Sequence, residues 1–328
     1  MAIKSSGSSL SFSEIEAEFG SNGTRSLGSY RLTQNVGSLS NLPLDSGIPT
    51  SGTIKFSDFY SKRLNVVVDC FSGGNETRKV AKNDKWNNNQ VTVVGGFRSK
   101  KEDGSKIIIN VNKKFCSNKD ATSRCALRTG SWSSSATVQV DVGSSGKILG
   151  SGGDGGRGAN GIDCSGQAGG TGTSGLGIEV NNCTVNVSSG GIIRAGFGGG
   201  GGGGGDRQVD KGQDRRASGG GGGGGAGCPP GAGGPRGSTP SLGSNGSGGS
   251  ETAGGGGGGG GNNENQAYGG SGGNGGQAQG GAGGGQSRDT GGGGAGASGA
   301  AIRRTSGFSV SINNSGTIQG STTATGTS

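Results

Sequence analysis

The chain has 328 residues, contains 85 glycines but no histidine, and carries a formal net charge of +9. Without histidine, a Ser-His-Asp or Cys-His nucleophile is excluded, and the cysteines form no C-x-x-C pair that would indicate a zinc site. The sequence contains no run of about 18 apolar residues, so it predicts no membrane span. The start of the chain, "MAIKSSGSSLSF", lacks the apolar core of a signal peptide. We therefore expect a non-enzymatic protein, made in a cytoplasm, with no catalytic residue, metal or other cofactor.

Residues 1–63 open and close with two similar phrases, "SGSSLSFSEIEAEFG" and "SGTIKFSDFYSK". In the first phrase Ser13 and Glu16 form an S-x-x-E capping box, which predicts a short helix. A piece with so few core residues is too small to be stable alone, so we expect it to dock on a partner. The expected docking residues are the apolar members of the two phrases: Phe12, Ile15, Phe19, Phe56, Phe59 and Tyr60.

Residues 64–145 contain several β-branched runs, such as "LNVVVDCF", "KIIINVNKKF" and "ATVQVDV", which are separated by turn-forming residues. Alternating valines predict half-buried strands, and we expect a small antiparallel β-sandwich with Trp86 and Trp132 at its core or rim. The basic residues concentrate in this part of the chain. We interpret them as a solvated face, and no nucleic-acid partner is expected because no aromatic nucleic-acid motif accompanies them.

A phrase then recurs three times, in "VQVDVGSSGKI", "VNVSSGGII" and "VSINNSGTI". Each copy has alternating apolar residues, a short polar turn and the pattern G-x-I. The aligned positions are Gly146, Gly190 and Gly316 with Ile148, Ile192 and Ile318. Internal repetition indicates similar stacked units, so we expect three strand–turn–strand hairpins or coils that anchor the glycine-rich part.

Residues 146–328 hold 71 of the 85 glycines, with pure runs at 198–205, 219–225 and 254–261. Polyglycine in the polyproline-II geometry is a threefold helix whose N–H and C=O groups point sideways, so bundled helices can satisfy one another. At about 3.1 Å per residue an eight-residue run spans about 25 Å. The similar lengths predict a bundle that folds back and forth, with the intervening residues 206–218, 228–253 and 262–268 as loops at its ends.

Loops on a rigid scaffold are a usual place for recognition, so these inserts carry the candidate site. Arginine side chains suit carboxylate and phosphate groups, and Tyr268 suits stacking on a sugar. The alternative interpretation is that the loops only solubilise the bundle. The candidates are Asp206, Arg207, Gln208, Asp210, Lys211, Gln213, Asp214, Arg215, Arg216, Asn262, Asn263, Asn265, Gln266 and Tyr268.

The cysteines leave the disulfide question open. Cys70, Cys116, Cys125, Cys164, Cys183 and Cys228 allow about fifteen full pairings, and sequence alone selects none of them. Bridges formed after release from the cell and packed free thiols both fit the sequence.

Two parts of the sequence resemble proteins of tailed bacteriophages. The paired phrases of residues 1–63 resemble an N-terminal module of phage tail and structural proteins. The stretches "VNVSSGGIIRAGFGGGGGGGG" and "VSINNSGTIQG" resemble the glycine-rich domains of phage tail-fibre and tail-tip adhesins. In that family the glycine-rich domain is a sandwich of polyglycine-II helices, and its distal loops bind outer-membrane proteins or polysaccharide of the host.

The sequence predicts a mainly β protein in three parts: a virion-docking module at 1–63, a β-domain at 64–145 and a polyglycine-II domain at 146–328. The resemblance covers residues 1–63 and 136–328. It implies a receptor-binding adhesin of the virion tail. The expected partners are other tail proteins and a host surface polysaccharide or outer-membrane protein, with a homo-oligomer in the virion as a further possibility. The alternative is a structural virion protein of the tail, baseplate, collar or capsid that binds no receptor.

Overall fold

Most strands of the chain fall into three parallel sheets, and the only α-helix among the described residues is α1 (Phe12–Phe19). The computed structural model describes the chain except for residues 1–2, 20–25, 31–33, 37–38, 43–47, 50, 63–65, 71–77, 80–90, 96–105, 118–121, 131–136, 161–164, 211, 239–241, 264–266, 278–280, 286–290 and 328. The expected anchors Trp86 and Trp132 lie outside the described residues. Within that part of the chain, no helix has both the length and the apolar character needed to cross a membrane.

The sheets are built from strands that are distant in the sequence. The first contains β3 (Val66–Cys70), β6 (Lys106–Val111), β9 (Thr137–Val142), β12 (Cys183–Val187) and β19 (Val310–Asn314), with β5 (Val91–Gly95) antiparallel at its edge. The second contains β7 (Lys114–Cys116), β10 (Lys147–Leu149), β13 (Ile192–Arg194) and β20 (Thr317–Gln319). The third contains β4 (Arg78–Lys79), β8 (Cys125–Arg128), β11 (Ser174–Ile178), β18 (Ile302–Arg304) and β21 (Ala324–Thr325).

The chain visits the three sheets in turn, so it winds as a three-sided coil. Successive turns are β6–β7–β8, β9–β10–β11, β12–β13–β18 and β19–β20–β21. Equivalent residues stack in register, for example Ile109 on Val140 and Val140 on Val185, and these three side chains are fully buried in the core. The predicted antiparallel sandwich is therefore wrong. Apolar alternation reports only that one face of a strand is buried, and it is the same for parallel and antiparallel partners.

The recurring phrase forms one corner of this coil. Its two strands lie in different sheets, as β9 and β10 do, so each copy is a coil and not a hairpin. Strand register aligns Gly146 with Gly191 and Gly316, because Lys147 pairs with Ile192 and Ile192 with Thr317. The sequence alignment on Gly190 and Ile192 was therefore wrong by one residue.

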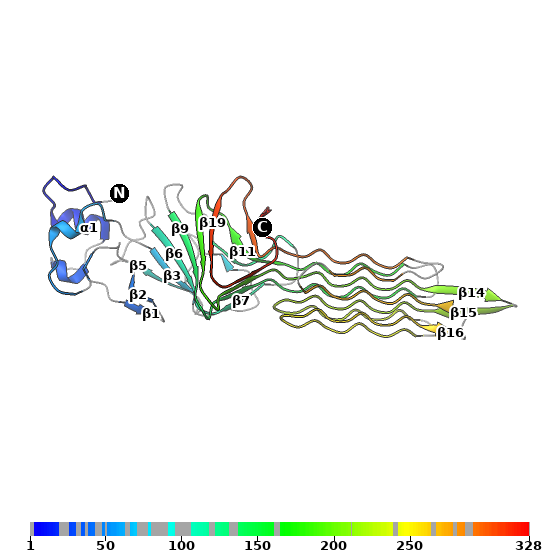
Figure 1. Cartoon of the computed structure of the whole chain (residues 1–328). Coiled ribbons are helices and arrows are strands. Elements are labelled where there is room, and N and C mark those ends of the chain that lie inside the picture. Colours follow the sequence, from blue (N-terminus) through cyan, green and yellow to red (C-terminus); the bar gives the residue numbers. More distant parts are fainter. Residues whose placement is uncertain are drawn as a thin grey trace.

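The glycine-rich part consists of two excursions from the same corner of the coil. Residues 150–173 leave after β10 and return at β11, and residues 195–301 leave after β13 and return at β18. Hydrogen bonds in the sheets thus continue across the expected boundary between residues 145 and 146. Figure 1 shows the glycine-rich segments running side by side away from the sheets. They are 150–160, 165–173, 195–205, 218–228, 229–238, 242–250, 254–261, 269–277, 281–285 and 291–301.

Hydrogen bonds between these segments repeat every third residue. In segment 195–205, N–H groups donate in turn to carbonyls of three neighbours: Gly199 to Gly170, Gly200 to Gly223, Gly201 to Ala282, then Gly202 to Gln167, Gly203 to Gly220 and Gly204 to Gly285. The backbone of one segment is therefore satisfied by its neighbours and not by itself.

Two segments are enclosed by others. Segment 195–205 exchanges hydrogen bonds with 150–160, 165–173, 218–228, 269–277, 281–285 and 291–301. Segment 218–228 does so with 150–160, 195–205, 229–238, 242–250, 254–261 and 269–277. These two hold the runs 198–205 and 219–225, where a Cβ on most glycines would clash with a neighbouring backbone. Full enclosure therefore explains why glycine is uninterrupted there.

Residues 228–253 were expected to be a loop at the end of the bundle, and that prediction was wrong. Segments 229–238 and 242–250 join the array through N–H groups such as those of Gly231, Gly234 and Gly246. An outer segment faces its neighbours on only part of its surface, so glycine at about every third position is enough. The positions between them, such as Pro235 and Ser247, are exposed.

The N-terminal module has a small core of its own. Ile15 and Phe59, from equivalent positions of the two phrases, are fully buried and pack with Ile3 and Ile48, which are almost fully buried. Of the expected docking residues, Phe12 and Phe56 are partly buried, with their rings edge to face at 4.8 Å between centroids, and Tyr60 is partly buried as well. The side chain of Phe19 is not among those described.

The helix cap differs from the expected one. The Ser11 N–H donates to Glu14 Oε2 at 2.8 Å, two residues before the predicted Ser13–Glu16 box. Helix α1 therefore begins at Phe12.

Candidate functional site

The candidate site is the end of the glycine-rich array that lies farthest from the sheets, where Figure 1 places β14, β15 and β16. Strands β14 (Asp206–Asp210) and β15 (Gln213–Ala217) form an antiparallel hairpin that joins the two enclosed segments. Strands β16 (Asn262–Asn263) and β17 (Ala267–Tyr268) form a second hairpin. Both inserts were expected to be loops. Gly212, with φ +79°, permits the tight turn that lets the first insert pair with itself.

Two buried polar residues at the base of the first hairpin hold the neighbouring turns. Asp206 Oδ2 accepts the Tyr268 N–H at 2.8 Å. The Ser218 hydroxyl oxygen accepts the Gly243 N–H at 2.8 Å, and the Ser218 carbonyl accepts the Gly261 N–H, also at 2.8 Å. Asp206 and Ser218 are both fully buried. They therefore join the two hairpins and the start of segment 242–250 at one end of the array, which we call the tip.

One face of the first hairpin carries a charge cluster. Arg207 and Arg216 are cross-strand partners, and both donate to the Asp214 carboxylate, with Arg207 Nε to Oδ1 and Arg216 Nε to Oδ2 each at 3.0 Å. The hydrogen bonds from Arg216 and Arg207 lower the pKa of Asp214 to about 2. Because Asp214 stays ionised at any higher pH, this face has two positive charges and one negative charge.

The opposite face of the hairpin carries amide side chains. Gln208 faces Arg215 across the strands, and Arg215 Nη2 donates to Gln213 Oε1 at 2.7 Å. The structure thus separates the candidate residues of 206–217 onto two faces. Asn262 and Tyr268 are cross-strand partners in the second hairpin and are exposed.

Some candidates fall on parts that the structure does not describe. Lys211, Asn265 and Gln266 lie outside the described residues, and the side chains of Asp210 and Asn263 are not described.

Two residues of the tip, Val209 and Leu242, were not among the candidates predicted from the sequence. The exposed large apolar side chains of the described residues are Val209 at 65%, Leu242 at 48% and Tyr268 at 41%. Val209 lies in β14 with Asp206, Leu242 precedes the Gly243 that is bonded to Ser218, and Tyr268 is bonded to Asp206, although only Tyr268 was among the candidates. A signal was present, because these are the only large apolar side chains between residues 198 and 300, in a stretch with no core to receive them.

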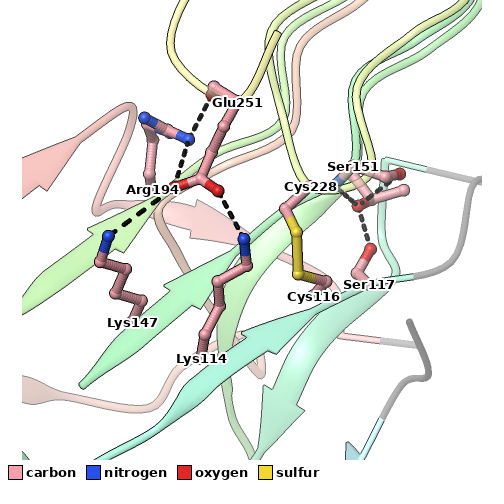
Figure 2. Close-up of a disulfide and its surroundings, with 9 residues drawn as sticks. Lys114, Cys116, Ser117, Lys147, Ser151, Arg194, Cys228 and Glu251 are labelled. Atoms are coloured by element: carbon pink, nitrogen blue, oxygen red, sulfur yellow. Dashed lines mark hydrogen bonds and ion pairs between the residues drawn. A yellow bond between two sulfur atoms is a disulfide. The ribbon is translucent and has the colours of Figure 1, made fainter. Parts of the chain in front are cut away.

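The opposite end of the array is fixed to the sheets. Figure 2 shows Lys114, Lys147 and Arg194, from three neighbouring strands, pointing toward Glu251. Lys114 Nζ donates to Glu251 Oε2 at 2.6 Å, and Lys147 Nζ lies 3.9 Å from Oε1. Arg194, which is almost fully buried, donates to the Glu251 carbonyl oxygen. Burial acts to raise the pKa of Glu251, but the hydrogen bond and charge of Lys114, with the charges of Lys147 and Arg194, outweigh it and lower that pKa.

A disulfide reinforces the same junction. Cys116 of β7 is bonded to Cys228, at the end of an enclosed segment (Figure 2). The free cysteines Cys125 and Cys183 are buried, and desolvation raises the pKa of each thiol to about 12. They are therefore protonated and suited to packing, not to nucleophilic chemistry.

Nothing in the described part of the chain suggests a metal centre, since no cluster of three or more His, Cys, Asp or Glu side chains occurs there.

A family model described as "Phage tail fibre adhesin Gp38" matches residues 75–323, about three quarters of the chain. The match includes the strands from β4 to β20, the glycine-rich segments and both tip hairpins, and it begins after the N-terminal module and β3. No curated protein and no solved structure matches the chain.

Proposed function

The chain belongs to the Gp38 family of phage tail fibre adhesins, and on that premise we propose how it presents its receptor-binding surface. As a member of this family it is a receptor-binding protein of the virion tail and not an enzyme. The proposal concerns the scaffold, the part that touches the receptor and the part that attaches to the tail.

The proposed scaffold is a bundle of polyglycine-II helices. Its support is the threefold recurrence of intersegment hydrogen bonds, as in the sequence from Gly199 to Gly204. In a threefold helix each residue points about 120° from the last, so an enclosed helix meets a neighbour at every position. Such a bundle is stiff because every segment is bonded to several others, and it carries the tip away from the sheets.

The proposed receptor-contacting part is the tip, and one observation carries this assignment. The two hairpins and the start of segment 242–250 are joined at Asp206 and Ser218, at the end of the array remote from the sheets. The scaffold between tip and sheets presents mainly backbone and small polar side chains. The candidate residues of the two hairpins, with the exposed apolar side chains, are the groups that can select a receptor on polysaccharide or outer-membrane protein.

This assignment is tested by exchanging the two hairpin sequences, 206–217 and 262–268, for those of a family member from a phage with another host. The exchanged protein should lose the ability to block adsorption of the parent phage and should block the donor phage. A matched control replaces residues 320–323, a turn of the coil, and should leave the block unchanged. An unchanged host range after the tip exchange would contradict the proposal.

We also propose that residues 1–63 attach the adhesin to the tail. The module has its own small core and lies outside the family match, as expected of a separate attachment unit. Because Ile15 and Phe59 are buried in that core, they are not accessible to a partner. The partly exposed rings of Phe12, Phe56 and Tyr60 are therefore the better docking candidates. A chain without residues 1–63 should still bind cells but should be missing from purified virions, as measured by mass spectrometry.

A further inference from the structure

We infer that the Cys116–Cys228 disulfide is a late, redox-controlled cross-link, which forms after the adhesin has folded and has left the reducing interior of the cell that made it. Once formed, the bond fixes the enclosed segment 218–228 to the coil. This role is separate from receptor binding and does not depend on which residues of the tip touch the receptor.

The chain itself connects only part of the array to the coil. Four segments continue directly into coil strands, namely into β10, β11, β13 and β18. The other six segments have no direct chain connection to a coil strand: 218–228, 229–238, 242–250, 254–261, 269–277 and 281–285. For these six, the disulfide at Cys228 is the one covalent cross-link to the coil in the described part of the chain.

The two sulfur atoms are brought together by contacts that do not need the bond. Cys116 is held in β7 by pairing with β10, in register with Leu149. The Cys228 N–H donates to the carbonyl oxygen of Gly150, the residue after Leu149, at 2.8 Å. Cys116, Leu149 and Cys228 pack as one apolar cluster beside Ile192. The two thiols are therefore neighbours in the folded, reduced protein, so the bond can follow folding.

Charged groups hold the same junction without any oxidation. Glu251, in the turn after segment 242–250, accepts a hydrogen bond from Lys114 Nζ at 2.6 Å, and its carbonyl oxygen accepts one from Arg194 (Figure 2). Before the disulfide forms, these contacts and the hydrogen bonds between segments are what join the six segments to the coil. The disulfide then adds a link that solvent and salt do not weaken.

The chemistry of the bond sets when it forms. A phage virion protein is made inside a host cell, where thiols are kept reduced, and acts outside it, where disulfides persist. Closure joins the two Sγ atoms and releases two protons and two electrons. Dioxygen takes up both and becomes hydrogen peroxide, or a small disulfide takes them up and becomes two thiols. The closed bond is shielded from bulky reductants, because Cys116 and Cys228 are only 5% and 8% exposed.

The time of closure is tested by precipitating protein in acid, which stops thiol exchange, and alkylating the denatured chain with N-ethylmaleimide. Trypsin places Cys116, Cys228 and the buried free thiol Cys125 in separate peptides. In infected cells all three cysteines should be alkylated. In purified virions, mass spectrometry should find Cys116 and Cys228 joined and Cys125 still alkylated. A bond that is as complete in infected cells as in virions would overturn the inference.

The link to the coil is tested by hydrogen exchange on the full-length protein, first oxidised and then reduced with a phosphine. Reduction should leave the protein folded and should speed exchange in segment 218–228 by about ten-fold or more. The matched comparison is segment 165–173, which continues into β11 and whose N–H groups donate to 150–160 and 291–301. Exchange there should change by less than about two-fold.

A variant shows whether the effect belongs to this bond. The double variant C116S/C228S should exchange like the reduced wild type and should not respond to the reductant. Equal acceleration in segments 218–228 and 165–173, no acceleration in either, or a reduced protein that is unfolded would contradict the inference. None of these results bears on the tip exchange, so the proposed function is judged separately.

Discussion

Two alanine substitutions of glycine, one inside the array and one on its surface, should have effects of opposite sign. Gly200 lies in an enclosed segment, where a Cβ would sit 2.5 Å from the carbonyl carbon of Gly273 and closer still to its oxygen. Gly256 lies in an outer segment and is exposed, and its Cβ would find no atom nearer than 3.6 Å, at Ser247 Oγ. Both residues sit in pure glycine runs, so composition alone does not distinguish them.

The magnitude at Gly200 follows from the contacts that must open. Ordinary Cβ contacts begin at 3.4 Å and the Gly273 oxygen would lie at 2.0 Å, so segments 195–205 and 269–277 would have to separate locally by about 1.4 Å. Three hydrogen bonds join these segments, at 2.8–2.9 Å, from Gly270, Gly273 and Gly276. Losing them costs about 1.5–4.5 kcal/mol, and overpacking adds about 1–3 kcal/mol. We expect Gly200→Ala to lower the free energy of unfolding by about 2.5–7.5 kcal/mol, a large part of the stability of an ordinary domain.

Gly256→Ala should raise the free energy of unfolding by about 0.4–1 kcal/mol, because alanine restricts the unfolded chain and meets no clash in the folded one. Guanidinium titration gives both free energies, and hydrogen exchange at residues 198–205 reports whether the enclosed segment has opened. Equal effects of the two substitutions, or a loss of less than about 1 kcal/mol at Gly200, would refute the argument that enclosure demands glycine.

Three further outcomes are expected. Glu251→Gln should lower the free energy of unfolding by about 1–2 kcal/mol, since it removes the charge that Lys114 binds. The pKa of Glu251 is lowered in the folded state, so its contribution to stability is full above the ordinary value of 4.5 and is lost as pH falls through the folded pKa. Between about pH 5 and pH 2 the free energy of unfolding should therefore fall more steeply with decreasing pH for the wild type than for the variant. Cys228→Ser, which opens a link of sequence separation 112, should cost about 2–4 kcal/mol and lower the melting temperature in calorimetry. Asp206→Ala should speed hydrogen exchange at the Tyr268 amide and weaken cell binding, whereas Asp206→Asn, which keeps an acceptor oxygen, should restore both; equal exchange in the two variants would contradict the positioning role of Asp206.

The sequence by itself determined the broad character of the protein. The absence of histidine excluded Ser-His-Asp and Cys-His nucleophiles. The alternating valines predicted half-buried strands, and the recurring G-x-I phrase predicted stacked units. The runs at 198–205 and 219–225 predicted backbone packed directly on backbone, because no other residue permits it. These signals are local, and each depends only on the residue types within one short stretch.

The tertiary structure decided which segments meet. Apolar alternation does not specify a partner, so the parallel three-sided coil was not predictable from β9 or β12 alone. Gly231 and Gly234, three positions apart, bond to the enclosed segment 218–228 that lies beside them. The sequence does not show that this segment is their neighbour, so residues 229–250 were predicted to be a loop.

The tip depended on the tertiary structure in the same way. Val209, Leu242 and Tyr268 are separated by many glycines, and they come to the same end of the array through its backbone hydrogen bonds and through the bonds to Asp206 and Ser218. The sequence therefore fixes what each stretch is able to pack against. The order in which the chain leaves and re-enters the coil decides what it does pack against, because that order sets the neighbours of every glycine-rich segment.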